Sequence, residues 1–403
     1  MSKDVAPSEG EGTMEARKPK LIRVTTVSQS LADLLVGQLK FLNQYFEVVG
    51  VTSEDGKIQL VRDREGIRVE EIHIAREISI WSDIKSFIAL YRFFRKEKPE
   101  IVHTNTPKGS LLSMVAAKMA RVPHRIYLVT GLRYLGTEGK LRTLLKTMEK
   151  ITCWAANKVI PEGQGVKKIL MDDHITKKPL EVIHYGNING KDVNYYSLEA
   201  TQKKYGCRED FRKSMGIEAD EFAFVFVGRI VGDKGMNELA TAMKNLSPRY
   251  PKMKLVLVGP YEKELDPISP EAESFFLTDA SIIMAGNQDD VRPYLMAADA
   301  LVFPSYREGF PNVVLEAGLL GLPSIVTDIS GCNEIIVEGE NGVIVPPKDA
   351  EQLQTAMEKF LSEPDLLAAL ATNARSMIVS RFKQEDIWAA LLKMYQEEIQ
   401  KKK

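Results

Sequence analysis

Segments of strand character alternate with segments of helical periodicity along nearly the whole chain, and this alternation limits the possible folds more than any other feature. In the first half, the expected strands lie at residues 21–27, 46–53, 101–104 and 125–129. The expected helices between them lie at residues 31–42, 84–94, 111–120 and 141–156. Strands and helices that alternate over short connections are typical of a parallel sheet with helices on both faces. The first half therefore predicts an α/β domain.

The second half repeats this pattern after a polar stretch near 196–215, which we expect to be a linker. Its expected strands lie at residues 222–227, 254–258, 282–284, 300–303 and 323–327. Its expected helices lie at residues 236–246, 291–297 and 314–320. Two such series within 403 residues predict two doubly wound, Rossmann-like domains.

The expected domain boundaries follow from these two series. We expect a disordered tail at 1–20, an N-terminal domain at 21–200 and a C-terminal domain at 201–380. A last helix within 381–403 could pack on either domain and cross back to the first one. In open parallel sheets, ligands bind beyond the carboxyl ends of the strands, so the site is expected in a cleft between the two domains.

Composition excludes several classes of function. Lys plus Arg total 54 against 55 Asp plus Glu, so the formal net charge of −1 gives no sign of nucleic-acid binding. Three widely spaced cysteines, Cys153, Cys207 and Cys332, argue against a disulfide framework or a cysteine metal site and favour the cytoplasm. No apolar stretch approaches the roughly 20 residues of a membrane helix, and residues 1–20 lack the apolar core of a signal peptide. Any membrane contact is therefore expected to be peripheral.

Several familiar catalytic motifs are absent from the chain. It has no G-x-x-x-x-G-K-[ST] phosphate loop, no G-x-G-x-x-G after its first strand, no G-x-S-x-G elbow and no H-E-x-x-H pair. It also lacks a D-x-D pair of the kind that chelates a metal–nucleotide complex in one class of sugar transferases. These absences leave a metal-independent way of holding phosphate.

The first motif with chemical content follows the expected strand at 222–227. There the chain runs through G-R-I-V-G-D-K-G at 228–235 into a helix. Gly228 lets the backbone approach a ligand closely, while Arg229 and Lys234 bring two cations to one turn beside a helix N-terminus. This arrangement predicts a cradle for a diphosphate, and the alternative is a solvated, charged loop.

The second motif follows the expected strand at 300–303. It is P-S-Y-R-E-G-F-P-N-V-V-L-E-A at 304–317, with Glu308 in a loop and Glu316 inside the next helix. Carboxylates can accept hydrogen bonds from the vicinal hydroxyls of a sugar, and the helix N-terminus between them suits anionic oxygens. The alternative is a capping or surface role for both glutamates.

Together, these motifs resemble the donor domain of the retaining glycosyltransferases of family 4, which have the two-domain GT-B fold. Further segments agree in order, at residues 101–120, 185–193, 285–291, 328–334 and 341–342. The resemblance extends from about residue 21 to residue 395. It implies a GT-B fold whose two Rossmann-like domains face each other across a deep cleft.

The resemblance also implies an activity. Such an enzyme moves a hexose or N-acetylhexosamine from a nucleotide sugar, with UDP preferred from family habit alone, and needs no metal ion or bound cofactor. The implied acceptor is a polyprenyl-diphosphate-linked saccharide in capsule, O-antigen or exopolysaccharide synthesis. The implied location is the cytoplasm, with or without association with the inner face of the plasma membrane. The alternatives are a non-enzymatic nucleotide-sugar-binding subunit of a polysaccharide assembly complex and a GT-B UDP-sugar epimerase.

For the donor, the resemblance implies eight contact residues. They are Gly228, Arg229, Lys234, Glu308, Gly309, Phe310, Leu315 and Glu316. Arg229 and Lys234 would hold the diphosphate and neutralise charge on the leaving nucleotide. Glu308, with the backbone of the next two residues, would contact the donor sugar. Glu316 would bind the ribose and Leu315 would lie near the base. The residues expected to be catalytic are Glu308, Arg229 and Lys234.

The acceptor-side candidates are Ser30, Lys108, Thr130 and Arg133. Thr130 stands where many relatives carry a histidine, so the role of that histidine would pass to Thr130 or to backbone groups. Ser30 follows the first strand, and its alternative role is a helix cap. His103 ends another strand segment, where it is either a cleft residue or a structural histidine.

One helix bears on the acceptor. Within residues 140–150, apolar residues at 141, 144, 145 and 148 share one helical face, with basic residues at 140, 142, 146 and 150 around it. A basic amphipathic helix can lie on an anionic bilayer and guide a lipid-linked acceptor to the cleft. The alternative is ordinary core packing. The glycine-rich loop at 131–139 before it could close over an acceptor.

Overall fold

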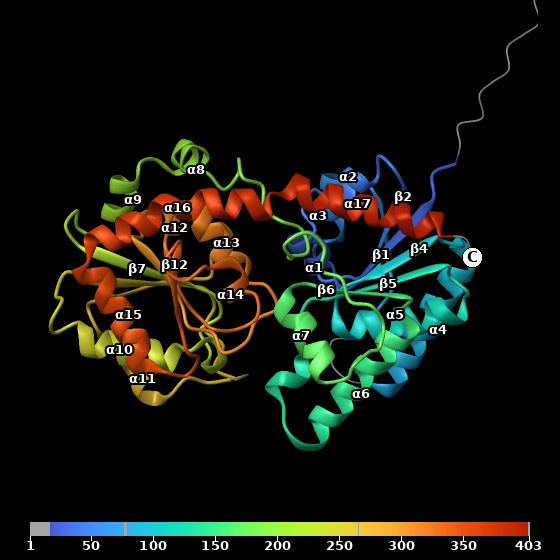
Figure 1. The fold of residues 1–403 in the computed structure, drawn as a ribbon, viewed down its shortest axis with the longest axis horizontal. Coiled ribbons are helices and arrows are strands. Elements are labelled where there is room, and N and C mark those ends of the chain that lie inside the picture. The colour runs from blue at the N-terminus through green and yellow to red at the C-terminus, as the bar shows by residue number, and fades with distance from the viewer. Residues whose placement is uncertain (1–16, 76–78, 265, 402–403) are drawn as a thin grey trace, which may run out of the picture.

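The computed structural model describes residues 17–75, 79–264 and 266–401, which form two α/β domains side by side (Figure 1). The N-terminal sheet is parallel, in the order β3-β2-β1-β4-β5-β6. Its strands are β1 (Lys20–Val27), β2 (Glu47–Ser53), β3 (Arg68–Glu71), β4 (Ile101–Thr104), β5 (His124–Val129) and β6 (Lys158–Pro161).

The C-terminal sheet has the same parallel design, in the order β12-β11-β10-β7-β8-β9. Its strands are β7 (Phe222–Val227), β8 (Met253–Val258), β9 (Ile282–Gly286), β10 (Ala300–Phe303), β11 (Ser324–Thr327) and β12 (Gly342–Val345). The predicted pair of doubly wound, Rossmann-like sheets is thereby confirmed.

Helices cover both sheets. Those before β7 are α1 (Ser28–Leu34), α2 (Gln38–Leu42), α3 (Ile58–Glu65), α4 (Ile80–Glu97), α5 (Pro107–Met119), the 3₁₀-helix η1 (Arg133–Gly136), α6 (Gly139–Ala155), α7 (Gln164–Asp172), α8 (Leu198–Tyr205) and α9 (Arg208–Ser214). Those after β7 are the 3₁₀-helix η2 (Gly232–Lys234), α10 (Met236–Leu246), α11 (Pro270–Thr278), α12 (Arg292–Ala297), α13 (Asn312–Leu319), α14 (Cys332–Ile335), α15 (Ala350–Ser362), α16 (Pro364–Phe382) and α17 (Gln384–Gln400).

The strands are apolar on both faces because helices cover both faces. In β1, Ile22 and Val24 pack into one apolar cluster of the N-terminal domain and Leu21 packs into the other. This split follows from the alternation of side chains along a strand. The central strands β4 and β10 are buried along their whole length.

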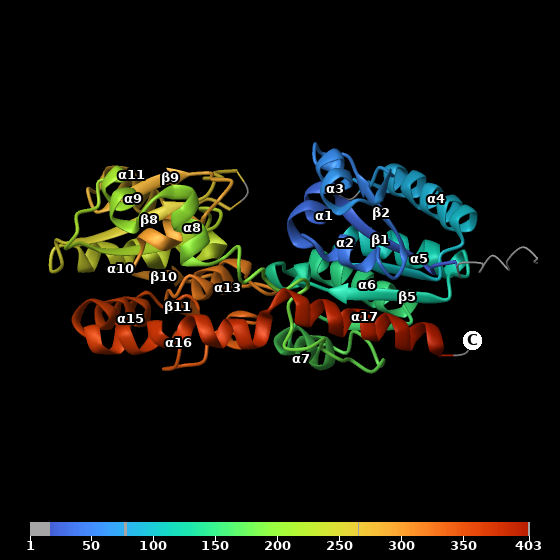
Figure 2. The same ribbon diagram turned by 90° about the horizontal axis from the view of Figure 1, so that it is seen from above.

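The chain crosses between the domains at two places that lie side by side. The Lys191 N–H donates to the Phe382 carbonyl oxygen at 2.9 Å, and the Gln384 N–H donates to the Lys191 carbonyl oxygen at 3.1 Å. Helix α16 covers the C-terminal domain, and α17 continues from it along the N-terminal domain (Figure 2). There Leu391, Met394 and Tyr395 join the apolar core.

The expected linker near 196–215 is wrong, because this stretch forms α8 and α9 and packs against α12. The Ser197 hydroxyl oxygen accepts the Ala200 N–H and caps α8. Arg208 and Arg212 on α9 form ion pairs with Asp299, at 2.5 and 3.2 Å. The polar residues that suggested a linker therefore attach these helices to the domain.

Two further expectations need correction. The single helix expected at 31–42 is divided into α1 and α2, because Gly37 has a left-handed backbone (φ +76°) and packs against Trp388. Of the tail expected at 1–20, residues 1–16 lie outside the described residues, and β1 already begins at Lys20. The Lys20 ammonium group holds this strand end through ion pairs with Glu47 and Glu97.

Candidate functional site

Two neighbouring cavities lie between the domains. The larger, of about 770 Å³, is lined by η1 and α7 on one side and by the segments after β7 and β10 on the other. The smaller, of about 270 Å³, has Thr130 and Arg133 on the N-terminal side and Arg229, Lys234 and Glu308 on the other. The ends of β5, β7 and β10 therefore meet at one interdomain site, as expected for parallel sheets.

The loop after β7 holds the two expected phosphate-binding cations. Lys234 ends η2, and its ammonium group pairs with Glu308 Oε1 from the loop after β10. The Arg229 guanidinium pairs with Glu262 Oε2 at 3.0 Å. Each cation thus has a carboxylate partner in this structure. An anionic ligand would compete with that carboxylate for the cation.

The two loops are held together at a glycine. Gly235 has a left-handed backbone (φ +72°), and a Cβ atom there would overlap the Pro304 carbonyl oxygen. The Ser305 hydroxyl donates to Glu308 Oε1 at 3.0 Å, which fixes the carboxylate from the other side. The spacing of Lys234 and Glu308 is therefore set by close backbone contact.

Not all of the expected donor residues line these cavities. Glu316 lies on α13, where its Oε1 contacts the Lys191 ammonium group at 2.5 Å and accepts the Tyr196 hydroxyl at 3.1 Å. Leu315 is fully buried in the core of the C-terminal domain, and Phe310 packs against Phe382.

The remaining donor candidates are glycines. Gly309 lines the smaller cavity together with Glu308. Gly228 lines neither of the two interdomain cavities, and its N–H donates to the Val258 carbonyl oxygen at 2.9 Å.

On the acceptor side, the structure separates the four candidates. Thr130 and the exposed Arg133 line the smaller cavity, and the Thr130 hydroxyl donates to the Asn105 carbonyl oxygen at 2.9 Å. Lys108 is buried and forms an ion pair with Asp83 at 2.7 Å. Ser30 lies inside α1, which begins at Ser28, so the capping role considered for Ser30 is wrong.

His103 is a structural histidine, fully buried beneath α17. Its Nδ1 atom lies 2.5 Å from the Tyr395 hydroxyl and also contacts the Arg23 guanidinium. Burial lowers the pKa of His103 well below its ordinary value, and the nearby Arg23 charge lowers it further. The imidazole is therefore neutral and binds α17 to the sheet.

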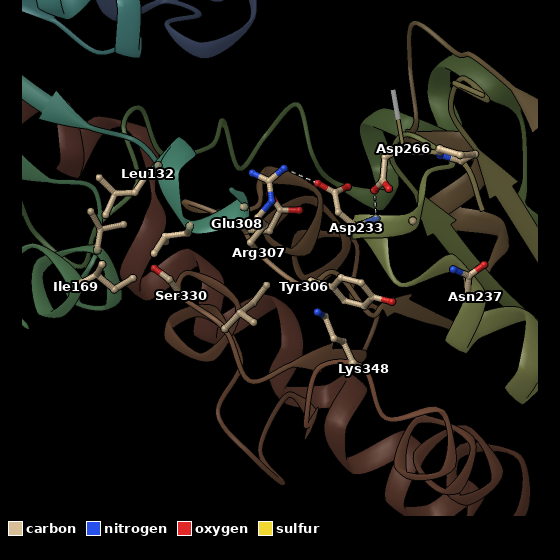
Figure 3. A pocket seen from close by; sticks show the side chains of 17 residues that line it. Leu132, Ile169, Asp233, Asn237, Asp266, Tyr306, Arg307, Glu308, Ser330 and Lys348 are labelled. Atoms are coloured by element: carbon tan, nitrogen blue, oxygen red, sulfur yellow. Dashed lines mark hydrogen bonds and ion pairs between the residues drawn. The ribbon is translucent and has the colours of Figure 1, made fainter. Parts of the chain in front are cut away.

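Several cleft residues were not predicted from the sequence. Arg307 reaches across to Gly136 and pairs with Asp233 Oδ2 at 2.7 Å (Figure 3). The Tyr306 hydroxyl donates to Glu238, at 2.7 Å from Oε1. Burial raises the pKa of Tyr306, and the hydrogen bond to Glu238 raises it further. Arg307 and Tyr306 stand within the 304–317 motif, and their position beside Glu308 is the sequence feature that could have predicted them as cleft residues.

Helix α6 leaves part of its apolar face uncovered. Leu141 and Leu144 are each 48% exposed, so the alternative of ordinary core packing is wrong for these two residues. Leu145 is partly buried against the domain core. Exposed basic side chains of Lys140 and Lys150 lie on the same helix.

The part of the chain that the structure describes holds neither a candidate metal centre nor a helix that could span a membrane. No group of three or more His, Cys, Asp or Glu side chains in that part could hold a metal ion. None of its helices is both long enough and apolar enough to cross a bilayer.

Comparisons with known proteins agree with this architecture. The family model described as glycosyl transferases group 1 matches residues 207–377, and the model described as glycosyl transferase 4-like matches residues 33–162. The capsular polysaccharide biosynthesis glycosyltransferase CapM of Staphylococcus aureus is 32% identical over 381 residues, covering 94% of this chain and 97% of the relative.

Two further likenesses extend over most of the chain. A UDP-Gal:alpha-D-GlcNAc-diphosphoundecaprenol alpha-1,3-galactosyltransferase of Escherichia coli is 27% identical, covering 84% of this chain and 86% of the relative. The crystal structure of Anabaena Alr3699/HepE in complex with UDP and glucose matches with a TM-score of 0.77 at 17% identity, covering 94% of this chain and 100% of that one. The latter likeness concerns the fold.

Proposed function

This chain belongs to the group 1 and 4-like glycosyltransferases of GT-B fold, and from that membership we propose its reaction. It transfers a hexose or N-acetylhexosamine from a UDP-sugar to a polyprenyl-diphosphate-linked saccharide, with retention of the anomeric configuration and without a metal ion. The main support is the meeting of Arg229, Lys234 and Glu308 with Thr130 and Arg133 around one interdomain cavity. The names of the capsular and diphosphoundecaprenol relatives support the acceptor class.

In this proposal the donor diphosphate replaces the carboxylate partners of two cations. The Arg229–Glu262 pair is partly exposed, and such pairs contribute only about 0–1 kcal/mol, so phosphate oxygens compete readily for Arg229. Lys234 is more buried, and its charge stabilises the negative charge that develops on the leaving UDP. Glu308, released from Lys234, then accepts hydrogen bonds from the sugar hydroxyls.

The acceptor approaches from the N-terminal wall of the same cavity. Its hydroxyl oxygen bonds to the anomeric carbon as the bond from that carbon to the phosphate oxygen breaks on the same face. The hydroxyl proton passes to the leaving diphosphate, so no protein base is required. Arg133 is exposed at this wall, where its guanidinium group suits the diphosphate of the lipid.

We also propose that the protein acts in the cytoplasm, at the inner face of the plasma membrane. The uncovered leucines of α6 lie next to exposed cations, which favours contact with an anionic bilayer. Such contact would bring a lipid-linked acceptor near the cleft.

A panel of radiolabelled nucleotide sugars, incubated with the purified protein and a bacterial lipid extract, tests the reaction. Label should enter the lipid fraction with a UDP-sugar, and NMR of the released saccharide should show the donor's anomeric configuration. Lys234→Ala should lower kcat/KM at least about 100-fold, because it removes charge stabilisation in the transition state. Lys252→Ala, which removes an exposed cation paired with Asp220, is the matched control.

Three outcomes would contradict the proposal. Transfer by Lys234→Ala at the wild-type rate would refute the site. Binding of a donor without transfer to any lipid would favour the non-enzymatic binding subunit, and release of free UDP from UDP-GlcNAc without an acceptor would favour the epimerase.

A further inference from the structure

A buried carboxyl group between the domains has no part in the transfer described above. Glu162 directly follows β6, and only 6% of its surface is exposed. Its N–H donates to the Val129 carbonyl oxygen at 3.0 Å, and its carbonyl oxygen accepts the Asn187 N–H at 2.9 Å. The backbone N–H of Ile188 lies near its carboxyl group and by itself favours the charged form, which lowers the pKa. The residue is therefore fixed by β5 on one side and by the first interdomain crossing on the other.

The Glu162 carboxyl group lies against the donor loop at Gly309. A Cβ atom on Gly309 would come within 2.9 Å of Glu162 Oε2 and would overlap the Thr130 carbonyl oxygen. Only glycine therefore lets the loop after β10 close this far onto the ends of β5 and β6. Because Gly309 follows Glu308, this contact sets how far the sugar-contacting carboxylate lies from the acceptor wall.

The charges around Glu162 distinguish it from its neighbours. Glu308 has Lys234 as its partner, and Glu334 accepts the N–H groups of Gln164 and Gly165 at 2.5 and 2.9 Å. Among the described residues, no cation lies within ion-pairing distance of the Glu162 carboxyl group. Burial raises the pKa of Glu162 well above its ordinary range, and the charges of Glu334 and Glu308 raise it further.

We propose that Glu162 is a positioning residue for the sugar transfer, which seats Gly309 against Thr130 as a neutral carboxylic acid and so fixes Glu308 relative to the acceptor. This inference rests on the proposed function. Loss of the proton would place an uncompensated charge between Glu308 and Glu334, and this charge would push the donor loop away from the N-terminal domain. Transfer should therefore weaken as the pH rises through the pKa of Glu162.

The test compares Glu162→Gln, Glu162→Ala and wild type in transfer assays between about pH 6 and pH 10. Glutamine keeps the size and neutral state of the protonated acid, so Glu162→Gln should keep the wild-type kcat at neutral pH and lose the decline at high pH. Glu162→Ala should lower kcat by about tenfold or more, with little change in the KM of the donor, because the reacting groups lose their alignment. Glu71→Gln, an exposed glutamate on β3, is the matched control.

A second measurement does not depend on activity. Hydrogen exchange of the backbone amides in 304–311 should be faster in wild type than in Glu162→Gln at high pH, and equal in the two proteins at neutral pH. Equal exchange at both pH values would overturn the inference, and so would a Glu162→Gln enzyme that keeps the wild-type decline. A wild-type protein that transfers no sugar, but shows the expected exchange difference, would refute the proposed function and leave the positioning by Glu162 supported.

Discussion

Lys234 and Glu308 form the contact that joins the two chemical parts of the proposed donor site. One stands at the end of the cradle after β7 and the other in the loop after β10, and their ion pair brings the two loops together before any ligand binds. Glu316 has a similar pairing with Lys191, a residue of the interdomain crossing. In the proposed reaction, the donor diphosphate exchanges the Lys234–Glu308 pair, whereas the Lys191–Glu316 pair lies outside both cavities.

A second buried acid, Glu149, makes stability depend on pH. It lies on α6, is 8% exposed and accepts the Tyr127 hydroxyl at 2.6 Å. Burial raises its pKa from 4.5 to about 7, so between these values the folded state keeps a proton that the unfolded state has released. The stability contribution is fully present below about pH 4.5 and is lost as the pH rises through 7.

Because of Glu149, the free energy of unfolding should fall by about 3 kcal/mol between about pH 5 and pH 9. Glu149→Gln should remove that part of the decline, because its amide stays neutral and still accepts from Tyr127. Urea unfolding of both proteins at the two pH values measures the difference. An identical decline in both proteins would show that Glu149 is ionised in the folded state.

At the scale of elements, the sequence predicts most of the strands, whereas two long helices, α15 and α16, were not predicted. Strands β7 and β10 match their expected bounds because each is an uninterrupted apolar run. Strands β3, β6 and β12 were not predicted. Each lies at an edge of its sheet and pairs with a single neighbour, and β3 has only one apolar residue.

Only some residues of the candidate site could be predicted from the sequence. Arg229, Lys234 and Glu308 could be predicted because they follow recognisable strands directly. Glu162 could not, because it follows β6 and meets Gly309 only through the approach of the two domains. Sequence patterns report local structure, whereas this contact depends on the tertiary arrangement of distant segments.

Helix α6 offers a test of the proposed membrane contact. Replacing Leu141 and Leu144 together by serine should weaken binding to vesicles that contain phosphatidylglycerol, because it removes two of the exposed apolar side chains of this helix. Both leucines are about half exposed, so the thermal unfolding midpoint should change little. Co-sedimentation with the vesicles at low and high salt measures the binding.

The control for this experiment is Leu277→Ser, which changes a leucine that is 60% exposed on the other domain. It should bind vesicles as wild type does. Equal binding by the control and the double variant would exclude α6 as the membrane-facing element.

At the scale of the whole molecule, α17 makes the two domains interdependent. It follows the C-terminal domain in sequence, yet its side chains complete the N-terminal core. Trp388 stacks on Phe41 of α2 and donates its indole N–H to Asn189 Oδ1 at 2.7 Å, beside the first crossing. The N-terminal domain is therefore incomplete without a helix that follows the C-terminal domain in the chain, and we expect cooperative unfolding.

The Tyr395 hydroxyl is the polar part of this attachment, and its removal tests the interdependence. It accepts from Arg23 Nη1 at 3.0 Å and lies 2.5 Å from His103 Nδ1, and all three side chains are almost wholly buried. Tyr395→Phe leaves the buried Arg23 with one partner fewer, which should lower the free energy of unfolding by about 1–3 kcal/mol. Tyr250→Phe, which removes a hydroxyl bound to Glu358 within the C-terminal domain, is the control.

Calorimetry distinguishes the possible results of Tyr395→Phe. If α17 couples the domains, the single unfolding transition of the Tyr395→Phe protein should move to lower temperature as a whole. Alternatively, it should separate into two transitions, with the N-terminal domain unfolding first, because the lost contact belongs to the N-terminal core. Tyr250→Phe should give a transition close to that of wild type. An unchanged Tyr395→Phe transition would mean that the other contacts of α17, such as those of Leu391, Met394 and Trp388, hold it in place. The buried Arg23–His103–Tyr395 cluster would then add nothing to the attachment.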